Sequence, residues 1–195
     1  METKKIIITG GANRIGRSIA LELANYDTQI VIHYSKSFTA AKKLKTELEN
    51  LGSVVYLFKA DLNNSRLTQR IIPFAQSKMK GINCLVNNAS VFENDNLNNF
   101  SEKSFLKHIN VNLKAPAILI KNFAKVCRGN SGNIINIIDQ RVEKLTPFFF
   151  SYTLSKSGLA TLTRTSAMKL APKIRVNAVS PGPTLKNKRQ SEKHF

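Results

Sequence analysis

Tyr152 and Lys156 are the two residues of this chain whose types and spacing best suit acid–base chemistry. They stand four residues apart at the start of a helix predicted over residues 152–170, which places them on one helical face, one turn apart. A nearby ammonium group favours the phenolate, so we expect the pKa of Tyr152 to lie below its ordinary value. The pair alone does not exclude a surface tyrosine beside a solvated lysine.

A glycine-rich turn near the N-terminus separates a predicted buried strand, residues 4–8, from a predicted helix, residues 17–24. Glycine lets the backbone approach a phosphate closely, and a helix N-terminus supplies free N–H groups and a partial positive charge. Residues 9–16 therefore predict a turn that binds a pyrophosphate, with an ordinary tight turn as the alternative.

Length and composition indicate one globular domain. The 195 residues suffice for one core, and 42% are hydrophobic. We assign residues 1–185 to a single domain and residues 186–195 to a basic, polar tail. No apolar run reaches the length of a membrane span, and a strand begins at once, so we expect a cytoplasmic protein. Cys84 and Cys127 form no metal or disulfide pattern, and no metal site is expected.

The net charge of +18 suggests a nucleic-acid partner, but the composition offers another explanation. The chain has 21 Lys, 20 Asn and 18 Ile against nine Arg, and A/T-rich codons encode the three abundant types. The basic residues are also spread along the chain. We therefore expect no nucleic-acid partner, and attribute to the charge at most an attraction for anionic ligands.

Apolar patterns alternate between strand and helix along the chain. Further strands are predicted at residues 28–33, 54–59, 84–87, 133–138 and 174–179. Further helices are predicted at residues 40–51 with Thr39 as cap, 65–80, and 101–125 with a bend at Pro116. Such alternation predicts a parallel sheet with helices on both faces, a three-layer, doubly wound Rossmann fold.

Polar residues follow all six predicted strands, and the carboxyl ends of parallel strands share one edge of the sheet, where ligands bind. These positions are residues 10–16, 33–37, 61, 87–90, 139 and 181–184. Their convergence predicts one ligand crevice.

Several motifs together resemble the short-chain dehydrogenase/reductase family, from residue 4 to about residue 185. They are the Thr9-to-Gly16 turn, Asn87-Asn88-Ala89, Asn112, Tyr152 with Lys156, and Pro181-Gly182. The resemblance implies a nicotinamide-dependent oxidoreductase in which Tyr152, Lys156 and Asn112 act together. It also implies further segments beyond the sixth strand, so we expect a fold truncated there, with activity in doubt.

Three departures from the family pattern are similar to those of pteridine reductases and bacterial dihydromonapterin or dihydrofolate reductases. Arg14 replaces a usual glycine, Asp139 replaces the usual catalytic serine, and Phe92 follows the Asn-Asn-Ala segment. The resemblance implies a substrate site of Arg14, Ser90, Phe92, Asp139 and Tyr152, with Phe92 stacked on a flat pterin.

Asp139 also carries a chemical argument. An ionised carboxylate cannot donate a hydrogen bond to a carbonyl group as serine does. A buried Asp139 with a raised pKa would instead pass a proton toward a ring nitrogen through Tyr152. We therefore predict an NADPH-dependent reductase of a pterin-like C=N bond. The alternatives are a carbonyl reductase, with Asp139 as a loop cap, and a cofactor-binding form with little activity.

NADPH is predicted over NADH because no acidic residue ends the second strand, where NAD-binding proteins hold the ribose hydroxyls. His33, Lys36 and Ser37 offer cations and a hydroxyl for a 2′-phosphate instead. With the resemblance, the expected cofactor-binding residues are Thr9, Gly10, Asn13, Arg14, Ile15, Gly16, His33, Tyr34, Lys36, Ser37, Asp61, Leu62, Asn88, Ala89, Ser90, Lys156, Pro181, Gly182 and Thr184. The helices that carry Asn112 and Tyr152 are expected to form a homodimer.

Overall fold

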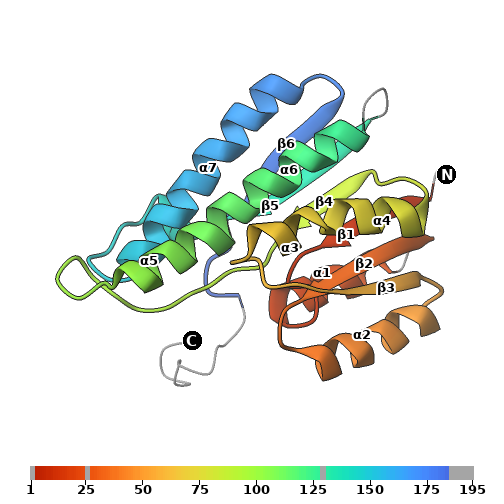
Figure 1. Cartoon of the computed structure of the whole chain (residues 1–195), viewed down its shortest axis with the longest axis horizontal. Coiled ribbons are helices and arrows are strands. Elements are labelled where there is room, and N and C mark those ends of the chain that lie inside the picture. Colours follow the sequence, from red (N-terminus) through yellow and green to blue (C-terminus); the bar gives the residue numbers. More distant parts are fainter. Residues whose placement is uncertain (1–2, 25–26, 128–130, 185–195) are drawn as a thin grey trace.

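A computed structural model describes residues 3–24, 27–127 and 131–184 (Figure 1). Six strands form one parallel sheet in the order β3-β2-β1-β4-β5-β6. The strands are β1 (Lys4–Ile8), β2 (Thr28–Tyr34), β3 (Val54–Lys59), β4 (Cys84–Asn87), β5 (Gly132–Ile137) and β6 (Ile174–Val179). The doubly wound fold and its six strands are as the sequence predicts. The basic tail, residues 186–195, lies outside the described residues.

Helices connect the strands on both faces of the sheet. The α-helices are α1 (Arg14–Leu23), α2 (Phe38–Asn50), α3 (Ser65–Gln69), α4 (Ile71–Met79), α5 (Glu102–Ile109), α6 (Ala115–Val126) and α7 (Phe150–Leu170). A π-helical turn, η1 (Asn110–Lys114), joins α5 to α6, and a 3₁₀ turn, η2 (Gln140–Val142), follows β5. The polar loops after the strands are therefore brought to one edge of the sheet.

Alternating side chains of the strands supply two cores. Ile6 and Ile8 of β1 pack with residues of α1 and α2 on one face of the sheet. Ile7 packs with residues of α4, η1 and α6 on the other face, and α7 also lies against this second cluster. This two-residue alternation with burial on both faces is what a central parallel strand requires. The result is the predicted three-layer arrangement.

Two helix assignments differ from the sequence prediction. The segment 65–80 is two helices because Pro73 has no N–H to donate to Gln69, where α3 ends. The helix predicted to start after Thr39 begins earlier, at Phe38, with Ser37 at the cap position. Thr39 therefore lies inside the first turn, and Phe38 packs near the ring of Tyr34 at 6.0 Å between ring centroids.

The long helix predicted over residues 101–125 contains the π turn η1 just before Pro116. Proline lacks the N–H that would bond to the carbonyl four residues back, and the N–H of Ala115 reaches back five residues to the carbonyl of Asn110. Pro116 itself sits in the first turn of α6, where a missing N–H is tolerated. The irregularity therefore falls in the turn that carries Asn112.

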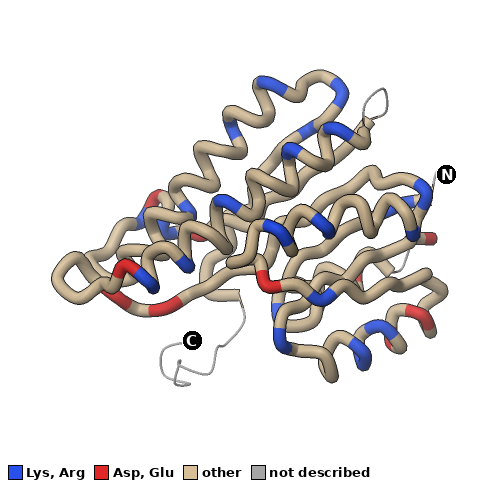
Figure 2. The backbone as a smooth tube through the Cα atoms, viewed as in Figure 1, with Lys and Arg blue, Asp and Glu red and all other residues tan. Residues whose placement is uncertain are grey.

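Lys and Arg residues are spread along α2, α4, α6 and α7 without gathering on one element (Figure 2). No helix within the described ranges combines the length and apolar character needed to cross a membrane.

Candidate active site

The turn after β1 is bonded to the loop after β4. Gly10 has a φ of +62°, and a Cβ atom there would lie 2.9 Å from Cα of Ala89. Nδ2 of Asn88 donates to the carbonyls of Thr9 at 2.9 Å and Gly10 at 3.1 Å. The Thr9 hydroxyl accepts from the N–H groups of Asn88 and Ala89. The two loops thus form one rigid floor, and Thr9 supports it from a buried position.

Arg14 takes a backbone conformation that favours glycine. Its φ of +49° lies in the left-handed region, which costs a non-glycine residue about 1–2 kcal/mol. This geometry gives a physical reason for the glycine that is usual at this position in the family that the sequence resembles. Here the strained position carries a guanidinium group at the start of α1, where it lines the cavity described below.

His33 has a structural role, which corrects its prediction as a cationic donor. Its Nδ1 accepts from the N–H of Gly10 at 3.1 Å, so Nε2 carries the proton and donates to the carbonyl of Ala60 at 3.1 Å. Burial lowers the pKa of His33 to about 4, although the bond to Ala60 and the charge of Asp61 act in the opposite direction. His33 is therefore neutral at neutral pH and fixes the glycine turn.

His33 still lines the cavity, but two nearby residues that were predicted to bind the cofactor do not. Tyr34 is buried against Ala12 and Ala41, and Ser37 stands at the start of α2. Between them, Ser35 and Lys36 do line the cavity. Strand alternation accounts for one pair only: within β2, His33 faces the cavity and its neighbour Tyr34 points to the opposite face.

Tyr152, Asp139 and Lys156 meet at the base of the crevice. The hydroxyl of Tyr152 donates to Oδ2 of Asp139 at 2.7 Å. Nζ of Lys156 donates to the carbonyl of Ile137 at 2.8 Å and lies 5.6 Å from the centroid of the Tyr152 ring. Lys156 is almost fully buried. The lysine is thus held by β5, and the phenol proton points at a carboxylate.

This geometry corrects the predicted direction of the tyrosine pKa. Burial, the negative charge of Asp139 and the hydrogen bond to it all raise the pKa of Tyr152 above its ordinary value, outweighing Arg141 and Ser90. Burial also lowers the pKa of Lys156 to about 8, against the attraction of Asp139. The phenol of Tyr152 therefore stays protonated at neutral pH, and Lys156 loses its charge more readily than an exposed lysine does.

The start of α7, which carries Tyr152, is capped from a distant loop. The side chain of Asp95 accepts from the N–H of Ser151 at 3.1 Å and from its hydroxyl at 2.5 Å. The carbonyl of Asp95 accepts from the N–H of Phe150. Asp95 is buried, so these bonds satisfy a carboxylate that water does not reach well. Asp95 therefore positions Tyr152 through the helix.

Phe92 stacks on Phe149, with ring centroids 4.5 Å apart and planes 5° from parallel. The rings of Tyr152 and Phe92 meet in a T-shaped arrangement, with centroids 4.6 Å apart. The guanidinium carbon of Arg141 lies 4.5 Å from the Phe149 centroid and 5.5 Å from that of Phe92. An aromatic and cationic wall thus stands beside the acid–base residues.

Asn112 is fully buried and does not line the cavity. Its expected part in a proton relay, through a water molecule that it would place, stays a prediction. Its Oδ1 accepts from the N–H of Val91 at 2.8 Å, and Nδ2 donates to the carbonyl of Val91 and to the hydroxyl of Ser155. The amide is occupied by these bonds. Asn112 therefore joins the loop after β4 to α7.

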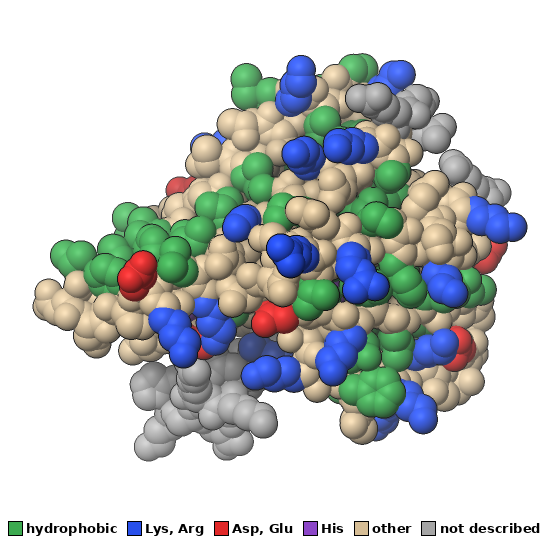
Figure 3. Space-filling view, viewed as in Figure 1, with side chains coloured by type: hydrophobic (Ala, Val, Ile, Leu, Met, Phe, Trp, Pro, Cys, Tyr) green, Lys and Arg blue, Asp and Glu red, His purple; other side chains and the backbone are tan. Residues whose placement is uncertain are grey.

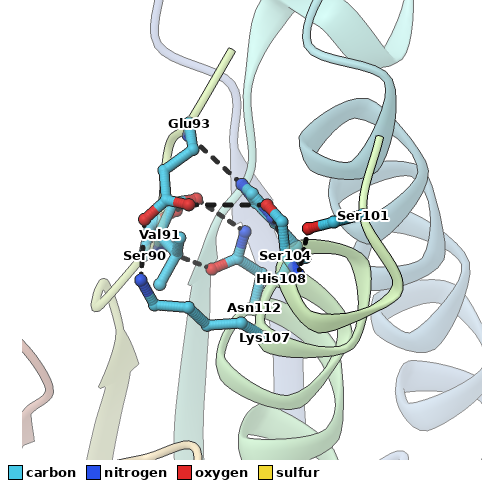
Figure 4. Close-up of polar contacts among 8 residues, drawn as sticks. All are labelled: Ser90, Val91, Glu93, Ser101, Ser104, Lys107, His108 and Asn112. Atoms are coloured by element: carbon cyan, nitrogen blue, oxygen red, sulfur yellow. Dashed lines mark hydrogen bonds and ion pairs between the residues drawn. The ribbon is translucent and has the colours of Figure 1, made fainter. Parts of the chain in front are cut away.

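The loop that carries Ser90 and Phe92 is also tied to α5 (Figure 4). The N–H of Glu93 donates to Nε2 of His108, and the Glu93 carboxylate pairs with Lys107 at 2.7 Å. The pairing with Lys107 lowers the pKa of Glu93. These contacts fix the loop after β4, which lies between α7 and the glycine turn.

A cavity of about 880 Å³ brings most of the predicted residues together. The predicted residues that line it are Gly10, Asn13, Arg14, Ile15, Gly16, His33, Lys36, Asp61, Leu62, Asn88, Ala89, Ser90, Phe92, Asp139, Tyr152, Lys156, Pro181, Gly182 and Thr184. Those that do not are Thr9, Tyr34, Ser37 and Asn112.

Some lining residues were missed by the sequence reasoning. They include Asn94, Lys107, Arg141 and Phe149. Phe149 precedes Tyr152 by three residues, nearly one helical turn, and Arg141 follows Asp139 by two. Their short distances along the sequence from Tyr152 and Asp139 could have identified Phe149 and Arg141 as site residues.

Comparison with protein families gives one match over nearly the whole chain. The model of the short chain dehydrogenases matches residues 4–194. A short-chain type dehydrogenase/reductase of Picea abies is 32% identical over 187 residues, covering 91% of this chain and 69% of that protein. The 3-oxoacyl-(acyl-carrier-protein) reductase FabG of Staphylococcus epidermidis is 30% identical over 181 residues, covering 92% of this chain and 74% of that protein.

Solved structures give a further comparison. FolM alternative dihydrofolate reductase 1 from Brucella suis, in complex with NADP, is 39% identical with a TM-score of 0.93, covering 98% of this chain and 77% of that one. The same reductase from Brucella canis, complexed with NADP, is 40% identical with a TM-score of 0.88, covering 93% of this chain and 74% of that one.

Proposed function

Because this chain belongs to the short-chain dehydrogenase/reductase family, we propose that it is an NADPH-dependent reductase of a C=N bond in a pterin or folate-like substrate. The observation that carries the proposal is the 2.7 Å hydrogen bond between Tyr152 and Asp139 beside the ring of Phe92.

The residues present fit a dinucleotide. A Cβ atom at Gly16 would lie 2.6 Å from Nδ2 of Asn88, so any other residue at this position would distort the turn. The start of α1 faces the same cavity as Asp61, Leu62 and Lys156. A helix N-terminus beside a glycine turn suits a pyrophosphate, and the cavity extends from there to the acid–base residues.

Lys36 supports a preference for NADPH. Among the lining residues between His33 and Lys36 no carboxylate is present to hold ribose hydroxyls, and Ser35 and Lys36 offer donors to a 2′-phosphate. The NADP complexes of the two Brucella reductases agree with this choice. Because His33 is neutral, the charge for the 2′-phosphate comes from Lys36, with Arg14 near the pyrophosphate turn.

NADPH supplies a hydride when it is bound. The residues of this chain supply the proton and the orientation of the substrate. Tyr152 holds a proton at its hydroxyl and Asp139 accepts it in a hydrogen bond, so the two share one proton next to the substrate wall. Lys156 is fixed by the carbonyl of Ile137 at the base of the site, and burial lowers its pKa to about 8, so its proton is more readily given up than that of an exposed lysine.

A flat substrate is supported by the wall that Phe92 forms with Phe149. Parallel aromatic rings provide a large apolar face on which a planar heterocycle stacks favourably. Ser90 and Arg14 border the same cavity with a hydroxyl and a guanidinium group. The FolM structures belong to reductases named for dihydrofolate, which has such a ring.

A carbonyl substrate is the second candidate, and the similarity to 3-oxoacyl reductases favours it. Asp139 argues against a carbonyl substrate, because a carboxylate that accepts a hydrogen bond from the phenol has no donor to offer to a carbonyl oxygen. Binding without turnover is the remaining alternative.

One experiment separates the three. The purified chain is titrated with NADPH by fluorescence, and NADPH oxidation is then followed with 7,8-dihydrobiopterin, with 7,8-dihydrofolate and with a 3-oxoacyl thioester. We expect turnover with the dihydropterins to exceed that with the thioester. Turnover of the thioester alone would contradict the substrate assignment, and NADPH binding with no turnover would contradict the enzymatic one.

A further inference from the structure

Most guanidinium N–H donors of Arg141 have no close acceptor among the described residues. It lies on η2 two residues after Asp139, and its N–H donates to Oδ1 of that carboxylate at 2.9 Å. Its guanidinium Nη1 is 3.6 Å from the same oxygen, an ion pair longer than a hydrogen bond. Nε of Arg141 is buried and finds no partner among the described residues. A guanidinium group has five N–H donors, and none of the contacts given above is a guanidinium hydrogen bond of normal length.

The position of Arg141 is set by two aromatic rings. Its guanidinium carbon is 4.5 Å from the centroid of Phe149 and 5.5 Å from that of Phe92, while the two rings are 4.5 Å apart. The guanidinium group therefore lies over both rings, at cation–π distances. Cation–π attraction in a partly buried place holds it there, with 23% of the side chain exposed.

We propose that Arg141 is a specificity-determining residue that donates hydrogen bonds to an acceptor on the ring of a flat heterocyclic substrate. The inference rests on the proposed function and names the chemical feature that the site selects: an oxo group or ring nitrogen on the substrate, apart from the bond that is reduced. The same guanidinium group lies beside the wall on which the ring stacks and beside the carboxylate that bonds Tyr152.

An acceptor on the substrate's ring fits the position of Arg141 better than a charged tail of the substrate does. Arg141 is already within 3.6 Å of Asp139, whose other oxygen bonds the phenol, so its donors lie at the level of the reacting ring. A buried donor without a partner is unfavourable until an acceptor reaches the group. A ligand with an acceptor at this level therefore gains affinity that a purely hydrocarbon ring does not.

The test measures binding without turnover. Biopterin is titrated calorimetrically into the enzyme saturated with NADP⁺, which cannot deliver a hydride. Arg141→Met keeps the length and the apolar contact with Phe149 but removes every donor. Arg141→Lys keeps the charge with a different geometry. Arg164→Met, on the exposed side of α7, is the matched control for losing one arginine.

We expect biopterin to bind at least about tenfold more weakly to Arg141→Met, a difference of about 1.4 kcal/mol. The affinity of Arg141→Met for NADP⁺ should stay within about twofold of the wild-type value. Arg141→Lys should recover part of the lost biopterin affinity. Equal biopterin affinity in wild type and Arg141→Met would overturn the inference and leave the proposed function standing. A parallel loss of NADP⁺ affinity would overturn it too, by showing a structural role.

If Arg141→Met does not fold, Arg141→Leu, which also has no donor, is compared with wild type by the same criteria. Failure of the wild-type enzyme both to bind biopterin and to reduce a dihydropterin would overturn the proposed function, and the inference with it. The two failures are therefore distinguishable.

Discussion

Tyr152 donates its phenol proton to Asp139 across 2.7 Å, while Lys156, one helical turn further along α7, donates to the carbonyl of Ile137. The phenol is therefore paired with a carboxylate and not with the ammonium group. This arrangement keeps the tyrosine protonated and makes it a donor, which is the state that a reductase needs when the product takes up a proton.

Replacing Asp139 by asparagine should lower turnover with a dihydropterin by about 10²-fold or more, the usual scale for the loss of an acid–base group. The amide keeps the shape but no longer shares a proton with Tyr152. NADPH affinity, measured by fluorescence titration, should change little because Lys156 and the glycine turn remain. Unchanged turnover in Asp139→Asn would show that Asp139 only caps η2.

Asp139→Ser is the matched comparison for this prediction. Serine restores a neutral donor beside Tyr152, so we expect activity on a ketone to rise relative to activity on a dihydropterin. Steady-state rates with both substrates check this ratio. A fall in both rates by the same factor would argue against a role for this side chain in choosing the substrate.

Cofactor preference should depend on Lys36. We expect NADPH to bind at least about tenfold more tightly than NADH, about 1.4 kcal/mol, because a 2′-phosphate gains a charge-assisted contact there. Lys36→Ala should reduce that ratio, whereas Lys43→Ala, an exposed position on α2, should leave it unchanged. Equal affinities of the wild-type chain for NADPH and NADH would contradict the assignment.

Acid should destabilise the fold through His33. The unfolded histidine takes up a proton near its ordinary pKa of 6.5, whereas the buried one does so only near 4. Between these values the unfolded state binds more protons, so the free energy of unfolding falls as the pH falls from about 6.5 to about 4. His33→Gln removes this titration. Urea unfolding of both proteins across that range should show the wild type losing more stability, and parallel curves would refute it.

The cap on α7 should matter for stability as well as for activity. Asp95→Ala leaves the N–H and hydroxyl of Ser151 buried without their acceptor, which should lower the free energy of unfolding by about 1–3 kcal/mol. Turnover should fall too, because the first turn of α7 positions Tyr152. Asp95→Asn keeps an acceptor oxygen and should recover part of both losses in urea unfolding and rate measurements. Wild-type stability in Asp95→Ala would show that the cap is dispensable.

We also expect a homodimer through the helices that carry Asn112 and Tyr152. Figure 3 shows hydrophobic side chains gathered at the end of the molecule formed by α5 and the start of α7. Leu106 and Leu154, on these helices, are 46% and 44% exposed. Burying them against a second copy is favourable. Light scattering should give a dimer that Leu154→Asp weakens, and a monomeric wild type would contradict this.

Local patterns in the sequence were enough to predict the architecture. Apolar runs such as residues 84–87 are buried on both faces, and their alternation with helices permits only a parallel sheet with its loops at one edge. That edge then collects whatever follows the strands, so the amino-acid sequence by itself assigns Gly10, Asn88 and Asp139 to one cavity.

Protonation and pairing were decided only by the tertiary structure. His33 ends a strand in the expected place, but its depth and its bonds to Gly10 and Ala60 make it a neutral support and not a phosphate ligand. Lys156 lies on the expected helical face, yet its ammonium group donates to the carbonyl of Ile137 in β5. Periodicity reports local conformation and which face is buried. The pKa of a group and the choice of its partner depend on desolvation and on distances between segments far apart in the chain, and those exist only once the sheet has assembled.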